Sequence, residues 1–585
     1  MATAINALDN ANKQALSAAV HGGVFNAEHY GASPENSYSD NNTAIQAALT
    51  AAYVFGGGKV SITKPGVYYI GGATLRQYPG TEFHWGQGVI LRQASSATRG
   101  EAGRCLLAND GYLTPVEGNI TSITSVGRVC TVNHVAHGRS VGQWVVIYGT
   151  ASDGYGGVHR ITSVTADTFT YLAPRWLAVT TCVASAYTGF TQMKWRLCDE
   201  NISITGMGTI DYDNTNTPTG LTSLTTHAVI MAGIHNLLIE DVSSINSLKY
   251  CFFLSGVRKA YIRATNTYGP SDGIHCCGSC SDIDVFAVGT EGGDNNVAFG
   301  SINYTGYNIM PGPMEGLTTK SVGQSKGVAL RLYGSAEHAF RSVKFEDIRG
   351  GCNEQDVATI QITMDTNPSM IGGGNVNVKD ILIANAVSFT TGGLMQVQMS
   401  GTIGKCIYKD ATIQYPSAGI GRLIVLAGNC TIDTLEVHSV HERLGHSVVN
   451  IDAGASVNEI VLNGVDATCS YAVNSATNNP MTIRVVNCKL LNPSGSFRNS
   501  STSGVMTIKA SNSNCTTWLA RTAAQMFVVD GHCIRADASW INRTDGVMFY
   551  NTNAALGTLG KAGIVLGTGT GANSWKLLEN TTLAY

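Results

Sequence analysis

The chain has 585 residues, a length that indicates several domains or one elongated repetitive domain. Its 37 basic and 40 acidic residues give a net charge of −3, which excludes the electrostatic footprint expected for binding nucleic acid or inserting at an anionic membrane. Only 13% of residues are charged, 67 are Gly, and the 44% hydrophobic content is sufficient for a large core. This composition predicts a folded, mostly β protein.

The first 24 residues contain Asp9 and Lys13 within an Ala- and Asn-rich stretch that lacks an apolar run. We therefore expect neither a signal peptide nor a membrane span there. The 15 cysteines are odd in number and scattered, which does not fit a disulfide framework. Both observations indicate synthesis in a reducing compartment.

A capped amphipathic helix is predicted from Asp40, with Ala44, Ile45, Ala48 and Leu49 on its apolar side. The glycines at 56–58 end it, and 59–62 reads as a strand. We expect this helix to cover the N-terminal end of the coils that follow, since the terminal coil of a solenoid needs a cover.

Residues 105–200 are predicted to form a small antiparallel β domain inserted into an early coil. Its expected strands, separated by turns such as Asp153-Gly154, are 120–132, 144–148, 158–165 and 168–172.

A short repeat of apolar residues dominates the middle of the chain. Its first position recurs at Leu237, Ala260 and Ile283, so that each step is 23 residues. The series continues less strictly, mostly in steps of 23 to 29 residues, at Leu317, Val343, Ile381, Cys406, Leu435, Ile460 and Ile483. Alternation over three to five residues with Gly, Asn, Asp and Ser between predicts short strands joined by turns.

One coil every two dozen residues fits a right-handed parallel β-helix, whose stacked coils bury a continuous core. A leucine-rich horseshoe is the alternative, but its Leu-x-x-Leu-x-Leu signature is missing. Cysteines such as Cys251, Cys276, Cys406 and Cys488 then fall at or near core positions as small hydrophobic residues. The phase is lost after about residue 500.

The fold prediction is therefore all-β, with an inserted β domain and a β-rich C-terminal domain. The expected parts are a short N-terminal linker (1–24), a cap with the first coils (25–104), the insert (105–200), the main β-helix (201–500), and a C-terminal domain (501–585).

Acidic residues gather where two predicted coils adjoin. The strand containing Ile274 is followed 23 residues later by the strand containing Val297, so Asp272 is expected to stack on Asn295 with Asp294 beside it. Glu291 lies on the approach. Paired carboxylates can cleave a glycosidic bond, one protonating the leaving oxygen and the other activating water or attacking carbon. Equally, aspartates in turns often cap backbone N–H groups.

These residues resemble a known family. The segment 271–275, Ser-Asp-Gly-Ile-His, and the segment 293–299, Gly-Asp-Asn-Asn-Val-Ala-Phe, resemble paired motifs of polygalacturonase-like glycosidases and, more closely, of bacteriophage tailspike depolymerases with a pectate-lyase-like β-helix. The cap at 25–70, the strand and turn at 201–211, the small β module at 137–171 and the stretch 569–578 are similar to segments of phage tail proteins in the same order.

The resemblance implies an endo-glycoside hydrolase that cleaves a bacterial capsule or lipopolysaccharide O-antigen, with Asp294 as general acid and Asp272 as the base that positions water. Glu291 is a further catalytic candidate. Candidate substrate-binding residues, which include an aromatic ring able to stack on a sugar, are His275, Asn295, Arg331, Tyr304 and Glu315. The mechanism needs no cofactor.

The resemblance also implies a homotrimer in the virion tail, made in the host cytoplasm without a signal peptide and attached through its N-terminus to the tail, baseplate or an adaptor protein. Two alternatives keep the fold. A polysaccharide lyase would use a base and a positive group, for which His275, Tyr268 and Arg331 are available. A non-catalytic receptor-binding spike is favoured by Asn295, which replaces the second carboxylate of the family's Gly-Asp-Asp motif.

We expect no metal site. His275, Cys276, Cys277 and Cys280 are close in sequence, but neighbouring residues of a strand face opposite sides and converge poorly on one ion.

Overall fold

The computed structural model describes the following residues: 23–95, 105–178, 180–184, 190–213, 226–263, 266–286, 291–303, 306–307, 309–320, 328–350, 358–363, 375–388, 395–398, 400–413, 422–445, 447–491, 496–500, 506–515, 519–521, 527–533, 548–551, 563–567 and 575–578. Two compact units divide the chain, one comprising Met1–Phe340 with Asp365–Gly373 and the other Arg341–Met364 with Gly374–Tyr585. Among the described residues, no helix is long and apolar enough to cross a membrane.

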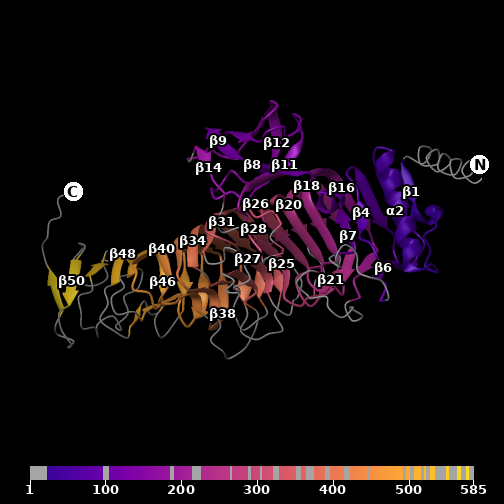
Figure 1. Cartoon of the computed structure of the whole chain (residues 1–585). Coiled ribbons are helices and arrows are strands. Elements are labelled where there is room, and N and C mark those ends of the chain that lie inside the picture. Colours follow the sequence, from indigo (N-terminus) through magenta and orange to yellow (C-terminus); the bar gives the residue numbers. More distant parts are fainter. Residues whose placement is uncertain are drawn as a thin grey trace, which may run out of the picture. The chain divides into compact units, whose positions relative to one another are not determined.

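The first unit begins with β1 (Val24–Asn26), a short 3-10 helix η1 (Ala27–Tyr30) and the helix α2 (Tyr38–Val54). The predicted helix is confirmed, although it starts earlier than Asp40 because Ser37 is the N-cap and accepts a hydrogen bond from the Asp40 amide. The buried side of α2 includes Ile45 and Leu49, and the helix lies at the N-terminal end of the unit, beside β1 (Figure 1).

Parallel strands stacked coil on coil form the body of this unit (Figure 1). The longest sheet includes β2 (Gly58–Ile62), β5 (Thr81–Trp85), β16 (Asp199–Gly206), β18 (Val229–Glu240), β20 (Phe252–Arg263), β22 (Ile274–Cys277), β23 (Ser281–Phe286), β25 (Asn295–Gly300), β26 (Met314–Lys320) and β27 (Val328–Tyr333). Leu237, Ala260, Ile283 and Leu317 are consecutive partners in register. The fold is thus a parallel β-helix, and the predicted repeat marks its rungs.

A second parallel sheet closes the coils. It consists of β3 (Gly66–Ile70), β6 (Val89–Gln93), β17 (Thr209–Asp211), β19 (Ser243–Ile245), β21 (Asn266–Gly269) and β24 (Glu291–Gly292). The inner residues are apolar and buried, among them Cys251 and Cys276, which are fully buried as expected for small core residues.

The inserted domain is an antiparallel sheet. Its strands are β8 (Glu117–Ile120), β9 (Ser122–Val126), β10 (Val129–Asn133), β11 (Trp144–Tyr148), β12 (Gly157–Val164), β13 (Thr168–Leu172), β14 (Thr181–Cys182) and β15 (Met193–Leu197). We call residues 117–197 the β module. Its limits are narrower than 105–200, because β7 (Leu107–Asn109) pairs with the coil strands β4 (Leu75–Gln77) and β18, and β16 already belongs to a coil.

Apolar contacts join the β module to the coils. Val146, Tyr148 and Val158 of the module share a buried cluster with Phe253 of β20 and Met310, which follows β25 in the chain. The module therefore packs on the outer face of the coils, next to β20 and β22.

The second unit continues the same architecture. Its longest parallel series is β31 (Asn375–Ala384), β34 (Ser400–Lys409), β37 (Cys430–His438), β40 (Ser456–Asn463), β43 (Met481–Val486), β46 (Met506–Cys515) and β48 (Phe527–Cys533). Ile381, Cys406, Leu435, Ile460 and Ile483 are successive partners, as the repeat predicts.

Parallel pairing runs past residue 501, where a separate domain was expected, since β46 pairs with β43 and β48 pairs with β46. Antiparallel pairing begins only with β49 (Met548–Asn551), β50 (Gly563–Gly567) and β51 (Trp575–Leu578). The step between coils changes from 25 residues (Ile483 to Ile508) to 21 residues (Ile508 to Val529), and this change hid the phase in the sequence.

Stacked left-handed residues shape the turns. In the second unit, Asn385, Asp410, Ser439, Gly464 and Asn487 have φ of 52°, 51°, 50°, 65° and 52° and occupy equivalent turns of successive coils. Each immediately precedes the small or apolar residue that ends the repeat. Only Gly, Asn and Asp adopt this conformation readily, which explains why those residue types separate the strands.

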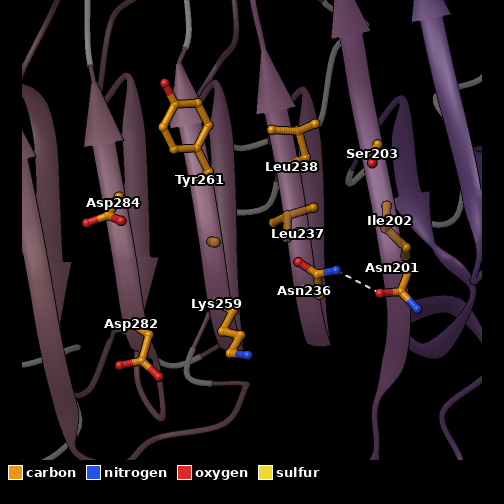
Figure 2. A pocket seen from close by; sticks show the side chains of 11 residues that line it. Asn201, Ile202, Ser203, Asn236, Leu237, Leu238, Lys259, Tyr261, Asp282 and Asp284 are labelled. Atoms are coloured by element: carbon orange, nitrogen blue, oxygen red, sulfur yellow. Dashed lines mark hydrogen bonds between the residues drawn. The ribbon is translucent and has the colours of Figure 1, made fainter.

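The first unit has a similar row on the outer face of β16, β18, β20 and β23. Asn201, Asn236, Lys259 and Asp282 have φ of 57°, 71°, 58° and 57° and lie side by side across the strands (Figure 2). Asn236 donates from Nδ2 to Oδ1 of Asn201 at 2.7 Å. This row lines a shallow depression of about 470 Å³.

The turn geometry yields a stability prediction at Ser439, which is exposed, so that substitution there tests backbone strain rather than burial. Ser439→Val places a β-branched residue at φ 50° and is expected to destabilise the fold by about 1–3 kcal/mol. Ser439→Gly, which tolerates that conformation, is the control and is expected to change stability by less than about 1 kcal/mol. Urea unfolding of the two variants measures the difference, and equal midpoints would contradict the role assigned to this position.

Candidate functional site

The site begins at the turn before β22. The parallel register pairs Ile274 with Val297, which sets Asn295 of the next coil beside Asp272 as the sequence predicts. Asn295 donates two hydrogen bonds to Oδ1 of Asp272, one from its backbone nitrogen (3.2 Å) and one from its side-chain Nδ2 (2.8 Å). The other carboxylate oxygen lies 2.6 Å from Nδ1 of His275. Asp272 is only 3% exposed, and both of its oxygens are engaged.

His275 links this carboxylate to a phenol two coils further on, on β27. Because a carboxylate only accepts, Nδ1 of His275 donates the proton to Asp272 and Nε2 is left as an acceptor. The hydroxyl of Tyr333 lies 2.7 Å from Nε2, and Nδ2 of Asn303 lies 3.0 Å from it. The result is a continuous hydrogen-bonded chain, Asp272–His275–Tyr333, which we call the Asp–His–Tyr chain.

Aromatic rings hold the imidazole in place. His275 is 1% exposed and stacks on the ring of Tyr250 at 3.8 Å and 12°, and Tyr250 stacks in turn on His227 at 4.9 Å. Gly300 makes room on the other side, because a Cβ there would lie 2.5 Å from the ring of Tyr333. The glycine, on the strand between, therefore allows Tyr333 of β27 to reach His275 of β22.

Burial sets the protonation states. Desolvation lowers the pKa of His275, and the hydrogen bond and charge of Asp272 offset this only in part, so the ring is neutral near pH 7. For Asp272, desolvation acts to raise the pKa, but the His275 hydrogen bond, the charges of His275 and Lys249 and the Asn295 hydrogen bond together bring the pKa below its usual value. The Asp–His–Tyr chain thus consists of an ionised carboxylate, a neutral imidazole and a phenol.

This arrangement can move a proton. A neutral histidine that is oriented by a carboxylate accepts a proton from a hydroxyl group, which is the logic by which enzymes activate nucleophiles and bases. Among the described residues, no group of three or more His, Cys, Asp or Glu side chains is placed to hold a metal ion.

The other predicted residues are placed as follows. Asp294 is half-buried and immediately precedes β25, next to the bonded Asn295. The guanidinium of Arg331 lies 5.7 Å from the centre of the Tyr333 ring. Tyr268, the base candidate for a lyase, is 44% exposed on β21. Tyr304 and the side chain of Glu291 lie outside the described residues.

Glu315 is not part of this cluster. Glu315 lies on β26, where its register partner is Ser281 of β23. Its carboxylate forms an ion pair of 3.4 Å with Arg175 of the β module. The resemblance suggested it as a substrate-binding residue, but β26 pairs with β23, the strand beyond the bend at Gly278.

Sequence reasoning did not assign Tyr333, Asn303 or Tyr250 to the site. Tyr333 follows Asn295 by 38 positions, a spacing outside the 23-residue phase, so counting could not align it with His275. Asn303 lies after β25 in a segment without periodicity. The one available signal was Gly300, which leaves a gap beside a strand residue.

No family model matches this chain, and no curated protein matches it. Solved structures of similar fold include the tailspike protein gp49 from Pseudomonas phage LKA1, with 12% identity and a TM-score of 0.41 over 86% of this chain and 81% of that chain. The gp54 tailspike of Acinetobacter baumannii bacteriophage AP22, in complex with a capsular saccharide, has 10% identity and a TM-score of 0.39 over 91% and 80% of the respective chains.

A Family 28 exopolygalacturonase from Yersinia enterocolitica is similar at 11% identity and a TM-score of 0.34, over 87% of this chain and 79% of that chain. The parallel β-helix itself rests on the strand pairing described above.

The buried neutral His275 predicts a loss of stability in acid. Its folded-state pKa lies below the unfolded value of about 6.5, so the unfolded chain binds the proton first and stability falls as pH drops below that value, by up to about 1.4 kcal/mol per pH unit. His275→Asn keeps a donor toward Asp272 without a titrating ring. Between pH 7.5 and 5, the midpoint of urea unfolding should fall further in the wild-type protein than in this variant.

His29→Gln changes an exposed histidine and serves as the control, which should match the wild-type protein. Identical acid sensitivity of the wild-type protein and His275→Asn would show that His275 is not held neutral.

Proposed function

We propose that this protein is a tailspike-type depolymerase that binds a bacterial surface polysaccharide, capsule or O-antigen, and cleaves it within the chain. The observation that carries the proposal is the junction of the two motif segments: Asp272 of the first is hydrogen-bonded to Asn295 of the second, with Asp294 adjacent. The residues that carry the resemblance to depolymerases therefore adjoin in space on neighbouring coils.

The two aspartates suit different tasks. Asp294 is half-buried, so it has more access to a substrate than Asp272 and is assigned as the general acid that protonates the leaving oxygen. Both carboxylate oxygens of Asp272 accept hydrogen bonds, and one of these bonds keeps His275 in one tautomer. Its contribution to hydrolysis is therefore to orient His275. Water activation then falls to the phenol of Tyr333, which ends the Asp–His–Tyr chain.

A β-helix suits a repetitive polymer. Equivalent positions of successive coils are about 4.8 Å apart, so a polysaccharide lying along the stack meets several similar subsites. Weak contacts at several subsites add to useful affinity. We include in the proposal a homotrimer attached through its N-terminus to a virion tail, for which size in solution is the first check.

Cleavage is tested by incubating the purified protein with capsule and lipopolysaccharide from a panel of bacteria, while following reducing ends and the absorbance of unsaturated uronate together. Hydrolysis predicts new reducing ends without absorbance. Asp294→Asn is expected to reduce kcat by at least about 100-fold with little change in KM, because general-acid catalysis typically contributes that much.

Asp410→Asn is the matched control. It is the same substitution at a turn aspartate of the second unit with φ 51°, a conformation that Asn accepts, and its activity should equal that of the wild-type protein. Full activity of Asp294→Asn would place the acid elsewhere, and binding without cleavage of any polymer on a sensitive strain would leave a receptor-binding spike.

Elimination is the second candidate, and the Asp–His–Tyr chain is the observation that favours it. A lyase removes the proton next to a uronate carboxylate and expels the glycosidic oxygen, leaving a double bond. Tyr333, whose proton is accepted by His275, would act as the base after losing that proton, and Arg331 would neutralise the carboxylate.

Product absorbance separates the two reactions, and Tyr333→Phe, which removes only the hydroxyl, tests whether this phenol is the base of an elimination. If the protein is a lyase, the variant should lose at least about 100-fold in kcat, and product absorbance should appear with the wild-type protein. Retained activity of Tyr333→Phe with no absorbance in either protein would exclude elimination through this phenol.

A further inference from the structure

A cleft separates the β module from the coils of the first unit. It has a volume of about 400 Å³ and lies between β12 of the module and the segment from β20 to β26. Basic residues dominate its charged lining: Arg128, Arg160, Arg175 and Arg258, against two carboxylates, Asp282 and Glu315. This concentration is local, because the whole chain has a net charge of −3.

Two of the four arginines are held by the protein. Arg175 pairs with Asp153 at 2.7 Å and with Glu315 at 3.4 Å, and Arg258 pairs with Asp282 at 3.3 Å. These ion pairs fix the walls of the cleft, and their carboxylates neutralise most of the positive charge of the two guanidinium groups.

Arg128 and Arg160 differ, because neither forms an ion pair with a carboxylate within the described part of the chain. Arg128 donates from Nε to the carbonyl of Ala173 at 2.8 Å, and Arg160 donates from Nε to the carbonyl of Gly142 at 3.2 Å. The carbonyls orient the two side chains without neutralising them. Both arginines are exposed, so their terminal nitrogens are available to an anion.

His159 supplies a second, independent feature. It lines the cleft, is 4% exposed, and its Nε2 has no hydrogen-bond partner among the described residues. The ring stacks on Tyr171 at 4.2 Å, which fixes its plane. Burial, helped by the charge of Arg258, lowers the pKa of His159 to about 4, so the ring is neutral near pH 7. A buried polar atom without a partner is costly unless a ligand or water satisfies it.

We propose that this cleft binds an acidic sugar residue of the polysaccharide, its carboxylate held by Arg128 and Arg160 and the buried ring of His159 forming part of the wall. Leu172 and Pro174 on the rim offer apolar contact to the C–H face of the ring. The identity of the polymer rests on the proposed function, but binding in the cleft requires no cleavage. The volume accommodates a ligand of one or two sugar rings.

The binding experiment compares tetragalacturonate with maltotetraose, a neutral chain of equal length, by isothermal titration calorimetry on the full chain at low and high salt. Tetragalacturonate should bind, and weaken as salt rises, whereas maltotetraose should bind at least 10-fold more weakly. The double variant Arg128→Gln with Arg160→Gln should weaken tetragalacturonate binding at least 10-fold and leave the unfolding midpoint within a few degrees of the wild-type value.

Arg484→Gln is the control for loss of a positive charge, since it lies in the second unit and pairs with Glu459 on the surface. It should bind like the wild-type protein. Inorganic phosphate serves as a further probe: if it binds as tightly as tetragalacturonate, the cleft is a general anion site and the proposal of a sugar subsite is overturned.

Equal binding of the double variant and the wild-type protein, or equal binding of the neutral and acidic chains, would also overturn it. These outcomes are distinct from failure of the proposed function, which would appear as intact binding without cleavage of any surface polysaccharide. Arg160→Glu alone reverses the charge at an exposed position, so it distinguishes lost binding from lost folding if the double variant is unstable.

Discussion

In-register stacking of parallel coils is the constraint on which the rest of the structure depends. Backbone hydrogen bonds between coils fix which residues become neighbours, and rows of apolar residues such as Leu237, Ala260 and Ile283 keep that register, because a shift of one residue would turn every buried side chain outward. Left-handed residues in the turns, such as Asn385 and Asn487, return the chain to the next rung. Stability and site geometry therefore have one origin.

The site follows from that register. Asp272 meets Asn295 because the two residues precede partners one coil apart, and His275 meets Tyr333 because Gly300, on the strand between, lacks a side chain. Burial then determines the chemistry: it lowers the pKa of His275, while hydrogen bonds keep Asp272 ionised. The β module adds a separate feature, a cleft in which Arg128 and Arg160 are oriented by carbonyl groups rather than neutralised by carboxylates.

Much of this could be predicted from the sequence, for a physical reason. A strand of period two and a coil of nearly constant length leave a pattern that can be counted, so the parallel β-helix, the cap helix, the inserted module and the contact between Asp272 and Asn295 were all accessible. Tyr333 and Asn303 were not, because they reach the site across segments whose lengths depart from 23 residues, and Tyr250 was not, because it precedes β20 and stands outside the repeated apolar positions. The cleft was also inaccessible, since Arg128 and Arg258 are brought together by packing of the module on the coils.

The central claim is that a polysaccharide is cleaved where the two motif segments adjoin. The most direct measurement is a crystal structure of the Asp294→Asn variant soaked with an oligosaccharide from a sensitive strain. The account predicts a glycosidic oxygen within hydrogen-bond distance of position 294, with the sugar chain continuing along the coils. An oligosaccharide bound elsewhere on the coils, with no linkage near position 294, would contradict it.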